Sequence, residues 1–148
     1  MNTALKPYAE KVATFTTLSA DTDQTAFTLP KMNEYNFYLT VSALATTDNP
    51  MDVSLQITPD GGTTWLTFAR FKPISASTDA EKDQRMRFRP IMCEGDVPGV
   101  DVLGLTGGAI AHNAPLPGTT ARFHVEETGT VTGFSATVWL VGNVAEGY

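Results

Sequence analysis

The residue types that most often act as nucleophiles or metal ligands are scarce in this sequence. There are two histidines, His112 and His124, and one cysteine, Cys93. A metal site built on both histidines would also need a carboxylate near them, and a cysteine nucleophile needs a neighbouring base. No pattern around these residues indicates either arrangement. We therefore expect no catalytic residue, no bound metal and no cofactor.

Carboxylates could bind a hard cation or cleave a glycosidic bond, and the chain has sixteen of them. Asp21 with Asp23, and Glu126 with Glu127, are the pairs that could ligate calcium, but neither pair lies in a loop like that of an EF-hand. No two acids stand out as the pair that glycoside hydrolysis requires. Exposed turn charges are the simpler interpretation, and we expect a protein that is not an enzyme.

The charge balance and the apolar runs exclude several partners. The net charge is −6 and the pI is about 4.7, so a basic surface for nucleic acid is not expected. No apolar run approaches the roughly 20 residues of a membrane helix, and residues 1–11 lack the apolar segment of a signal peptide. We expect a protein that is made in the cytoplasm and has no membrane partner.

The most specific pattern in the chain is an octapeptide, Thr58-Pro59-Asp60-Gly61-Gly62-Thr63-Thr64-Trp65. Pro59 has the φ that a turn needs at its second position, and Gly61 and Gly62 can adopt positive φ without a steric penalty. The Asp60 carboxylate can accept hydrogen bonds from turn amides, and the Trp65 ring can fold back over the turn. Apolar residues alternate with polar ones on both sides, so the pattern predicts a tight β-hairpin.

This octapeptide resembles the Asp box, a hairpin of sialidases and of many other extracellular and viral β proteins. The resemblance implies a folding role for Asp60 and Trp65, because the box lies away from the catalytic site in those families. A sialidase propeller is not expected, since it needs at least about four repeats of roughly 40 residues and this chain of 148 residues has one box. Stacking of Trp65 on a sugar is the alternative.

Alternation of apolar and polar residues predicts about eight strands separated by turn signals. The expected strands cover residues 12–18, 24–29, 35–43, 52–58, 63–71, 84–91, 119–126 and 134–141, with a turn at 21–23. We predict an all-β, single-domain antiparallel β-sandwich of jelly-roll type. Residues 1–11 are expected to form an N-terminal arm and residues 12–148 the sandwich. A long loop rich in Gly and Pro at 92–118 is apolar enough to pack on its own domain or on another subunit.

One expected strand carries an unusual row of cations, because Arg85, Arg87 and Arg89 share one face of it. In an acidic protein these arginines could pair with carboxylates of a neighbouring strand. They could instead dock an acidic patch on another chain, since arginine is enriched at interfaces. Trp139 lies in the last expected strand, on the face that points away from the inward residues of that strand. It is therefore either an exposed binding aromatic or part of a subunit interface.

As a whole, the chain is similar to the small β-rich virion proteins of tailed bacteriophages, above all the head decoration or cement proteins. The similarity lies in size, the Thr-rich sandwich pattern, the missing signal peptide and the hairpin from Asp60 to Trp65. It implies a structural protein that binds the major capsid protein on the capsid surface of the virion and stabilises the shell. It also implies a homo-oligomer, with a trimer as the favoured form, made in the host cytoplasm.

Two alternatives to a capsid protein stay open. A structural component of the phage tail belongs to the same class of protein. A carbohydrate-binding β-sandwich module would use exposed aromatic side chains to stack on sugar rings; the candidates are Trp65, Trp139, Tyr35 and Tyr38.

Overall fold

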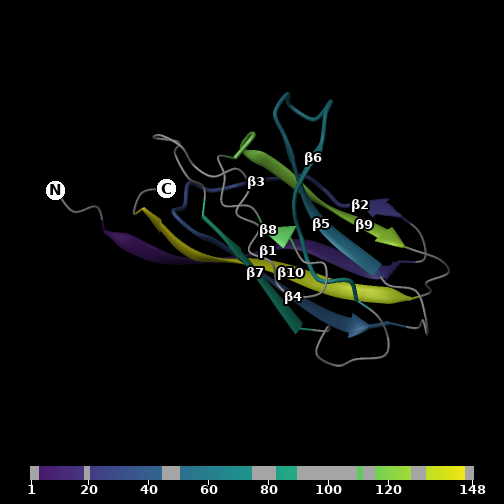
Figure 1. Cartoon of the computed structure of the whole chain (residues 1–148). Helices are drawn as coiled ribbons and strands as arrows, with labels where there is room; N and C mark the ends of the chain where they lie inside the picture. The colour runs from purple at the N-terminus through teal and green to yellow at the C-terminus, as the bar shows by residue number, and fades with distance from the viewer. Residues whose placement is uncertain are drawn as a thin grey trace.

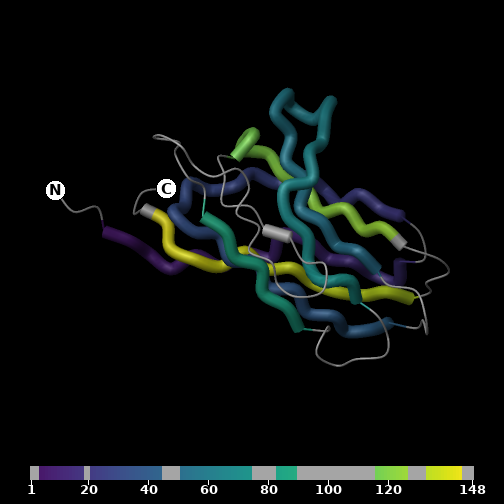
Figure 2. Tube along the Cα trace, in the orientation of Figure 1, coloured from purple at the N-terminus to yellow at the C-terminus, as the bar shows by residue number. Residues whose placement is uncertain are grey.

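The computed structural model describes residues 4–18, 21–44, 51–74, 83–89, 110–111, 116–127 and 133–145. Within these ranges all of the regular structure is β-strand, and the strands pack as two layers (Figure 1). In chain order the strands are β1 (Leu5–Leu18), β2 (Thr22–Asp23), β3 (Phe27–Thr28), β4 (Tyr35–Ala43), β5 (Met51–Thr58), β6 (Leu66–Arg70), β7 (Asp83–Phe88), β8 (Ile110–Ala111), β9 (Thr120–Glu127) and β10 (Phe134–Ala145). Figure 2 shows how the chain passes back and forth between the layers.

The two layers are antiparallel sheets. Sheet A has four strands in the order β1-β10-β4-β7, and sheet B has six, in the order β2-β9-β5-β6-β8 with β3 also paired to β9. The first and last strands in the sequence, β1 and β10, pair with each other. The strands that follow β1, namely β2 and β3, pair with β9, which precedes β10. The remaining strands complete both sheets. This interleaving of two antiparallel sheets is the jelly-roll arrangement. The jelly-roll sandwich that the sequence predicts is therefore confirmed.

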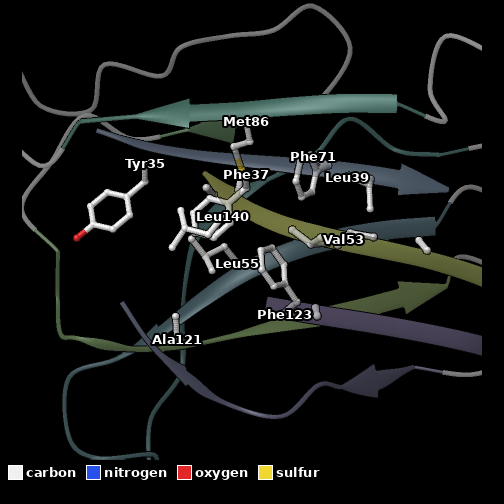
Figure 3. Close-up of a cluster of buried hydrophobic side chains, with 14 of the residues drawn as sticks. Tyr35, Phe37, Leu39, Val53, Leu55, Phe71, Met86, Ala121, Phe123 and Leu140 are labelled. Carbon is white, nitrogen blue, oxygen red and sulfur yellow. The ribbon is translucent and has the colours of Figure 1, made fainter. Parts of the chain in front are cut away.

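The core lies between the sheets and contains alternate residues of each long strand (Figure 3). In β4, Tyr35, Phe37 and Leu39 are buried. The Phe37 ring meets Phe123 of β9 edge-on at a centroid distance of 5.5 Å and stacks beside Phe88 of β7 at 5.9 Å. Full burial of an apolar side chain of this size contributes about 1.5–3 kcal/mol. This aromatic cluster therefore joins the two sheets and leaves the intervening residues on their outer faces.

Residues 5–11, which the sequence places in an N-terminal arm, form the first half of β1 and pair with the end of β10. The pairing of β10 with β4 ends at Val141. Beyond that residue β10 pairs with the first half of β1, so the two strands project together as a ribbon (Figure 1). Nearly all of its β1 side chains are exposed, which is why the sequence shows no alternation there. Pro7 is compatible with this strand because β1 lies at the edge of sheet A, where only alternate N–H groups point toward a neighbouring strand.

Other expected elements differ in their bounds. The turn expected at 21–23 contains β2, and only β3 is regular in the strand expected over 24–29, because both are short pieces that pair with β9. The second strand of the hairpin, β6, begins at Leu66 rather than at residue 63, because the turn is longer than expected. Most of the loop expected at 92–118 lies outside the described residues.

Candidate functional site

The turn between β5 and β6 is organised around the Asp60 carboxylate. Its Oδ1 accepts hydrogen bonds from the Thr64 N–H at 2.8 Å, from the Thr63 N–H at 3.1 Å and from the Thr58 hydroxyl at 2.9 Å. Hydrogen bonds to a carboxylate favour its ionised form. They lower the pKa of Asp60 from 3.8 to about 2, and the Thr64 backbone N–H is the largest cause. The carboxylate is thus a structural anion that closes the turn.

The two glycines and the tryptophan complete this turn. Gly61 has a φ of 77° and Gly62 a φ of 110°. Residues that carry a side chain rarely adopt such positive φ angles. The Trp65 Nε1–H donates to the Gly62 carbonyl oxygen at 3.1 Å, so the indole lies back over the turn. All four residues singled out in the Asp-box pattern, Asp60, Gly61, Gly62 and Trp65, therefore lie in one hydrogen-bonded unit.

A chain of side-chain contacts ties this hairpin to the outer face of sheet B. The Arg122 guanidinium of β9 lies over the Trp65 ring, 4.3 Å from its centroid. Arg122 Nε donates to Gln56 Oε1 of β5 at 2.8 Å, and its Nη1 lies 3.1 Å from Asp23 Oδ2 of β2. His124 Nδ1 lies 2.7 Å from Asp23 Oδ1. These polar groups satisfy one another, which points to a fastening between strands rather than to a binding site.

The candidates for metal and nucleophile chemistry lie partly within the described residues. Asp23, a calcium candidate in the sequence, is engaged by Arg122 and His124. Among the described residues no three His, Cys, Asp or Glu side chains are close enough to hold a metal ion, and none of those residues forms a helix long and apolar enough to cross a membrane. His112 and Cys93 lie outside the described residues.

Asp52 on the outer face of sheet B is a titratable group that the sequence pattern did not single out. Its Oδ1 is buried and has no hydrogen-bond partner among the described residues. Burial raises the pKa of Asp52; Glu126, directly opposite on β9, adds to the rise and Arg70 opposes it. Perturbed carboxylates often mark functional sites. Here burial disfavours the charged form of Asp52, so ionisation of this carboxyl group destabilises the folded protein.

The outer face of sheet A brings together the aromatic and arginine residues that the sequence singled out. A straight row crosses its four strands, because Lys11 lies opposite Trp139, Trp139 opposite Tyr38, and Tyr38 opposite Arg85. Trp139 is 38% exposed and Tyr38 40%, and Lys11 Nζ lies 5.7 Å from the centroid of the Trp139 ring. With strands about 4.8 Å apart, the row spans about 14 Å. It forms an aromatic pair with a cation at each end.

The arginines of β7 and Arg89 just beyond it divide into two groups. Arg89 Nε binds Glu34 Oε2 at 2.8 Å, and Arg87 Nε lies 4.0 Å from the same oxygen. The hydrogen bond from Arg89 is the largest of the causes that lower the pKa of Glu34, followed by one from Asn36. For Arg85, in contrast, the described part of the chain offers no carboxylate at ion-pair distance. Intramolecular pairing thus accounts for Arg87 and Arg89 and leaves Arg85 beside the aromatic pair.

Sequence patterns alone did not reveal that Lys11 and Tyr38 align with Trp139 and Arg85. Tyr38 lies in the polar phase of its strand, which is a usable signal, whereas residues 5–11 show no alternation. The neighbours of both residues depend on the register of strands far apart in the chain. Comparisons with protein-family models, with curated protein sequences and with solved structures give no match for this chain.

Proposed function

We propose that this chain is a structural protein of a virus particle, a decoration or cement protein that binds the bacteriophage capsid and stabilises it. The observation that carries this proposal is the outer face of sheet A, where Trp139 and Tyr38 stand exposed between Lys11 and Arg85. Tryptophan, tyrosine and arginine dominate the binding energy of protein interfaces. A jelly roll is also an architecture of viral capsid domains.

The proposed mechanism is stabilisation by binding. A protein that binds the assembled shell and not its separated subunits raises the stability of the shell by mass action. A rigid sandwich suits this role, because little conformational entropy is lost when a sheet face docks. The partner in this proposal is the major capsid protein, and the chain acts as a homo-oligomer, a trimer, on the capsid surface after synthesis in the host cytoplasm. The proposal invokes no cofactor, metal, nucleic acid or membrane.

Co-sedimentation tests the proposal directly. The full-length chain is mixed with empty shells assembled from the major capsid protein that the same genome encodes, and free and bound chain are measured over a range of concentrations. We expect saturable binding and a higher temperature of shell disruption. Absence of binding at micromolar concentrations would reject the capsid role. Binding to isolated tails instead would indicate the tail component, and light scattering of the free chain tests the trimer.

Carbohydrate binding is the second candidate, and the adjacent exposed rings of Trp139 and Tyr38 favour it. Aromatic faces pack well against the apolar faces of sugar rings, and jelly rolls also occur as lectin domains. A glycan array probed with the wild-type chain and with Trp139→Ala tests this candidate. Glycan binding that is lost in the variant, without binding to shells, would support it over the capsid role.

A further inference from the structure

We propose that the outer face of sheet A is the surface through which this chain docks, and that its partner is an acidic protein surface. Carboxylates of the partner would pair with Arg85 and Lys11, and a planar or apolar side chain would cover Trp139 and Tyr38. This inference rests on the proposed structural function and adds to it the docking face and the chemistry of the partner.

The charge of this face is opposite to the charge of the whole protein. The chain carries a net charge of −6. The outer face of sheet A nevertheless exposes a cluster of cations, namely Lys11, Arg85, Arg87 and Arg89. Its described carboxylates are Glu34, which Arg87 and Arg89 engage, and Asp83 at the far end of β7. Charge complementarity across interfaces therefore predicts an acidic partner.

The positions of the Trp139 and Tyr38 rings at the centre of the row are fixed by the sheet. Trp139 and Tyr38 form a cross-strand pair in the middle of a four-stranded sheet, so their Cβ atoms lie about 5 Å apart and their backbone is fixed. The cation of Lys11 lies over one ring. Around them stand polar side chains of the same face, Asn36, Thr40 and Thr137. An aromatic centre with a polar rim is the anatomy of a protein interface.

The outer face of sheet B lacks this character. Arg122 on this face already binds Asp23 and Gln56 and covers the ring of Trp65, and Arg70 lies near the Asp52 carboxylate. Groups that satisfy one another within the chain gain little from a partner, since they would lose these contacts to make new ones. The cations of the two outer faces thus differ, because Arg85 on sheet A has no ion-pair partner among the described residues.

The shape of the face favours a protein over a small glycan. A hollow of about 170 Å³ lies beside the row, toward the paired ends of β1 and β10, and it is lined by Leu5, Asn33, Glu34, Asn36, Gly142 and Asn143. A second hollow, of about 250 Å³, adjoins Lys11 at one end of the row. Both hollows are smaller than the roughly 300–1,000 Å³ of typical small-ligand sites, and neither Trp139 nor Tyr38 lines them. The aromatic pair itself stands on the open surface of the sheet, as a flat partner requires.

Binding of full-length variants to the same empty shells tests this inference. The variants are Arg85→Glu and Trp139→Ala, and Lys31→Glu is the matched control. Lys31 is exposed, lies at the end of the sandwich beside Leu29 and Leu116, and its substitution changes the net charge as Arg85→Glu does. We expect Arg85→Glu and Trp139→Ala to bind at least roughly tenfold more weakly and Lys31→Glu to bind like wild type. Melting curves must first show that all variants fold.

The outcomes separate this inference from the proposed function. Tight shell binding by all of the variants would overturn the docking face and leave the capsid role standing. No shell binding by wild type would reject both. Binding of wild type to polygalacturonate, an acidic polysaccharide, with loss in Trp139→Ala and no affinity for shells, would identify a glycan face and overturn the protein partner. Affinity for shells that is independent of salt would also count against it, because charge pairs at an interface rim weaken as salt increases.

Discussion

Arg122→Ala is expected to lower the free energy of unfolding by about 2 kcal/mol. The side chain of Arg122 is only 20% exposed, and it makes three contacts that alanine cannot replace. Its position over the Trp65 ring contributes about 0.5–2 kcal/mol, and its hydrogen bond to Gln56 about 1 kcal/mol. The ion pair with the half-exposed Asp23 contributes about 0.5 kcal/mol or less. Regained side-chain entropy offsets part of this loss.

Urea denaturation followed by far-ultraviolet circular dichroism measures this change. For a chain of this size, 2 kcal/mol corresponds to a decrease of about 4–8 °C in melting temperature. A double-mutant cycle of Arg122→Ala with Trp65→Ala isolates the stacking contact, and we expect a coupling of about 0.5–1 kcal/mol. Arg85→Ala is the control, because that exposed arginine should change stability by less than about 0.5 kcal/mol. If Arg122→Ala and Arg85→Ala lower the stability equally, or if Arg122 and Trp65 show no coupling, the role of Arg122 in fastening the hairpin to sheet B is refuted.

Three further predictions concern two carboxylates and a glycine. The pKa of Asp60 is about 2, below its ordinary 3.8, so the stability it contributes is present above about pH 4 and is lost as the pH falls toward 2. Asp60→Asn should flatten that part of a profile of melting temperature against pH. The pKa of Asp52 is raised, so its contribution is favourable at low pH and is lost as the pH rises through its folded pKa. In urea denaturation, Asp52→Asn should therefore stabilise the protein at pH 7, by about 1 kcal/mol, and less at pH 3; a loss at pH 7 would contradict this. A Cβ at Gly118 would lie 2.1 Å from the Thr58 carbonyl oxygen, so Gly118→Ala should cost about 2 kcal/mol, and an unchanged melting temperature would disprove this close approach.

Strands with one buried face could be predicted from the sequence because their signal is local. The strand expected over 35–43 has the same bounds as β4, and the one expected over 52–58 differs from β5 by one residue. In both strands apolar residues that face the core alternate with polar residues on the outer face, so the pattern is visible in the residues themselves. Residues 5–11 lack that signal, because nearly all of their side chains are exposed. Only pairing with β10, at the other end of the chain, makes them a strand.

The candidate sites divide in the same way. Turn chemistry acts within a few residues, and so the sequence by itself determined the turn around Asp60 with its two glycines, although not its full length. The contact of Arg122 with that hairpin, and the row that joins Trp139 to Arg85 through Tyr38, involve residues that lie far apart in the chain. Their alignment depends on strand register, and a slip of one residue would send each side chain to the opposite face. Tertiary structure alone decided which residues meet, because register is set by packing of the whole core.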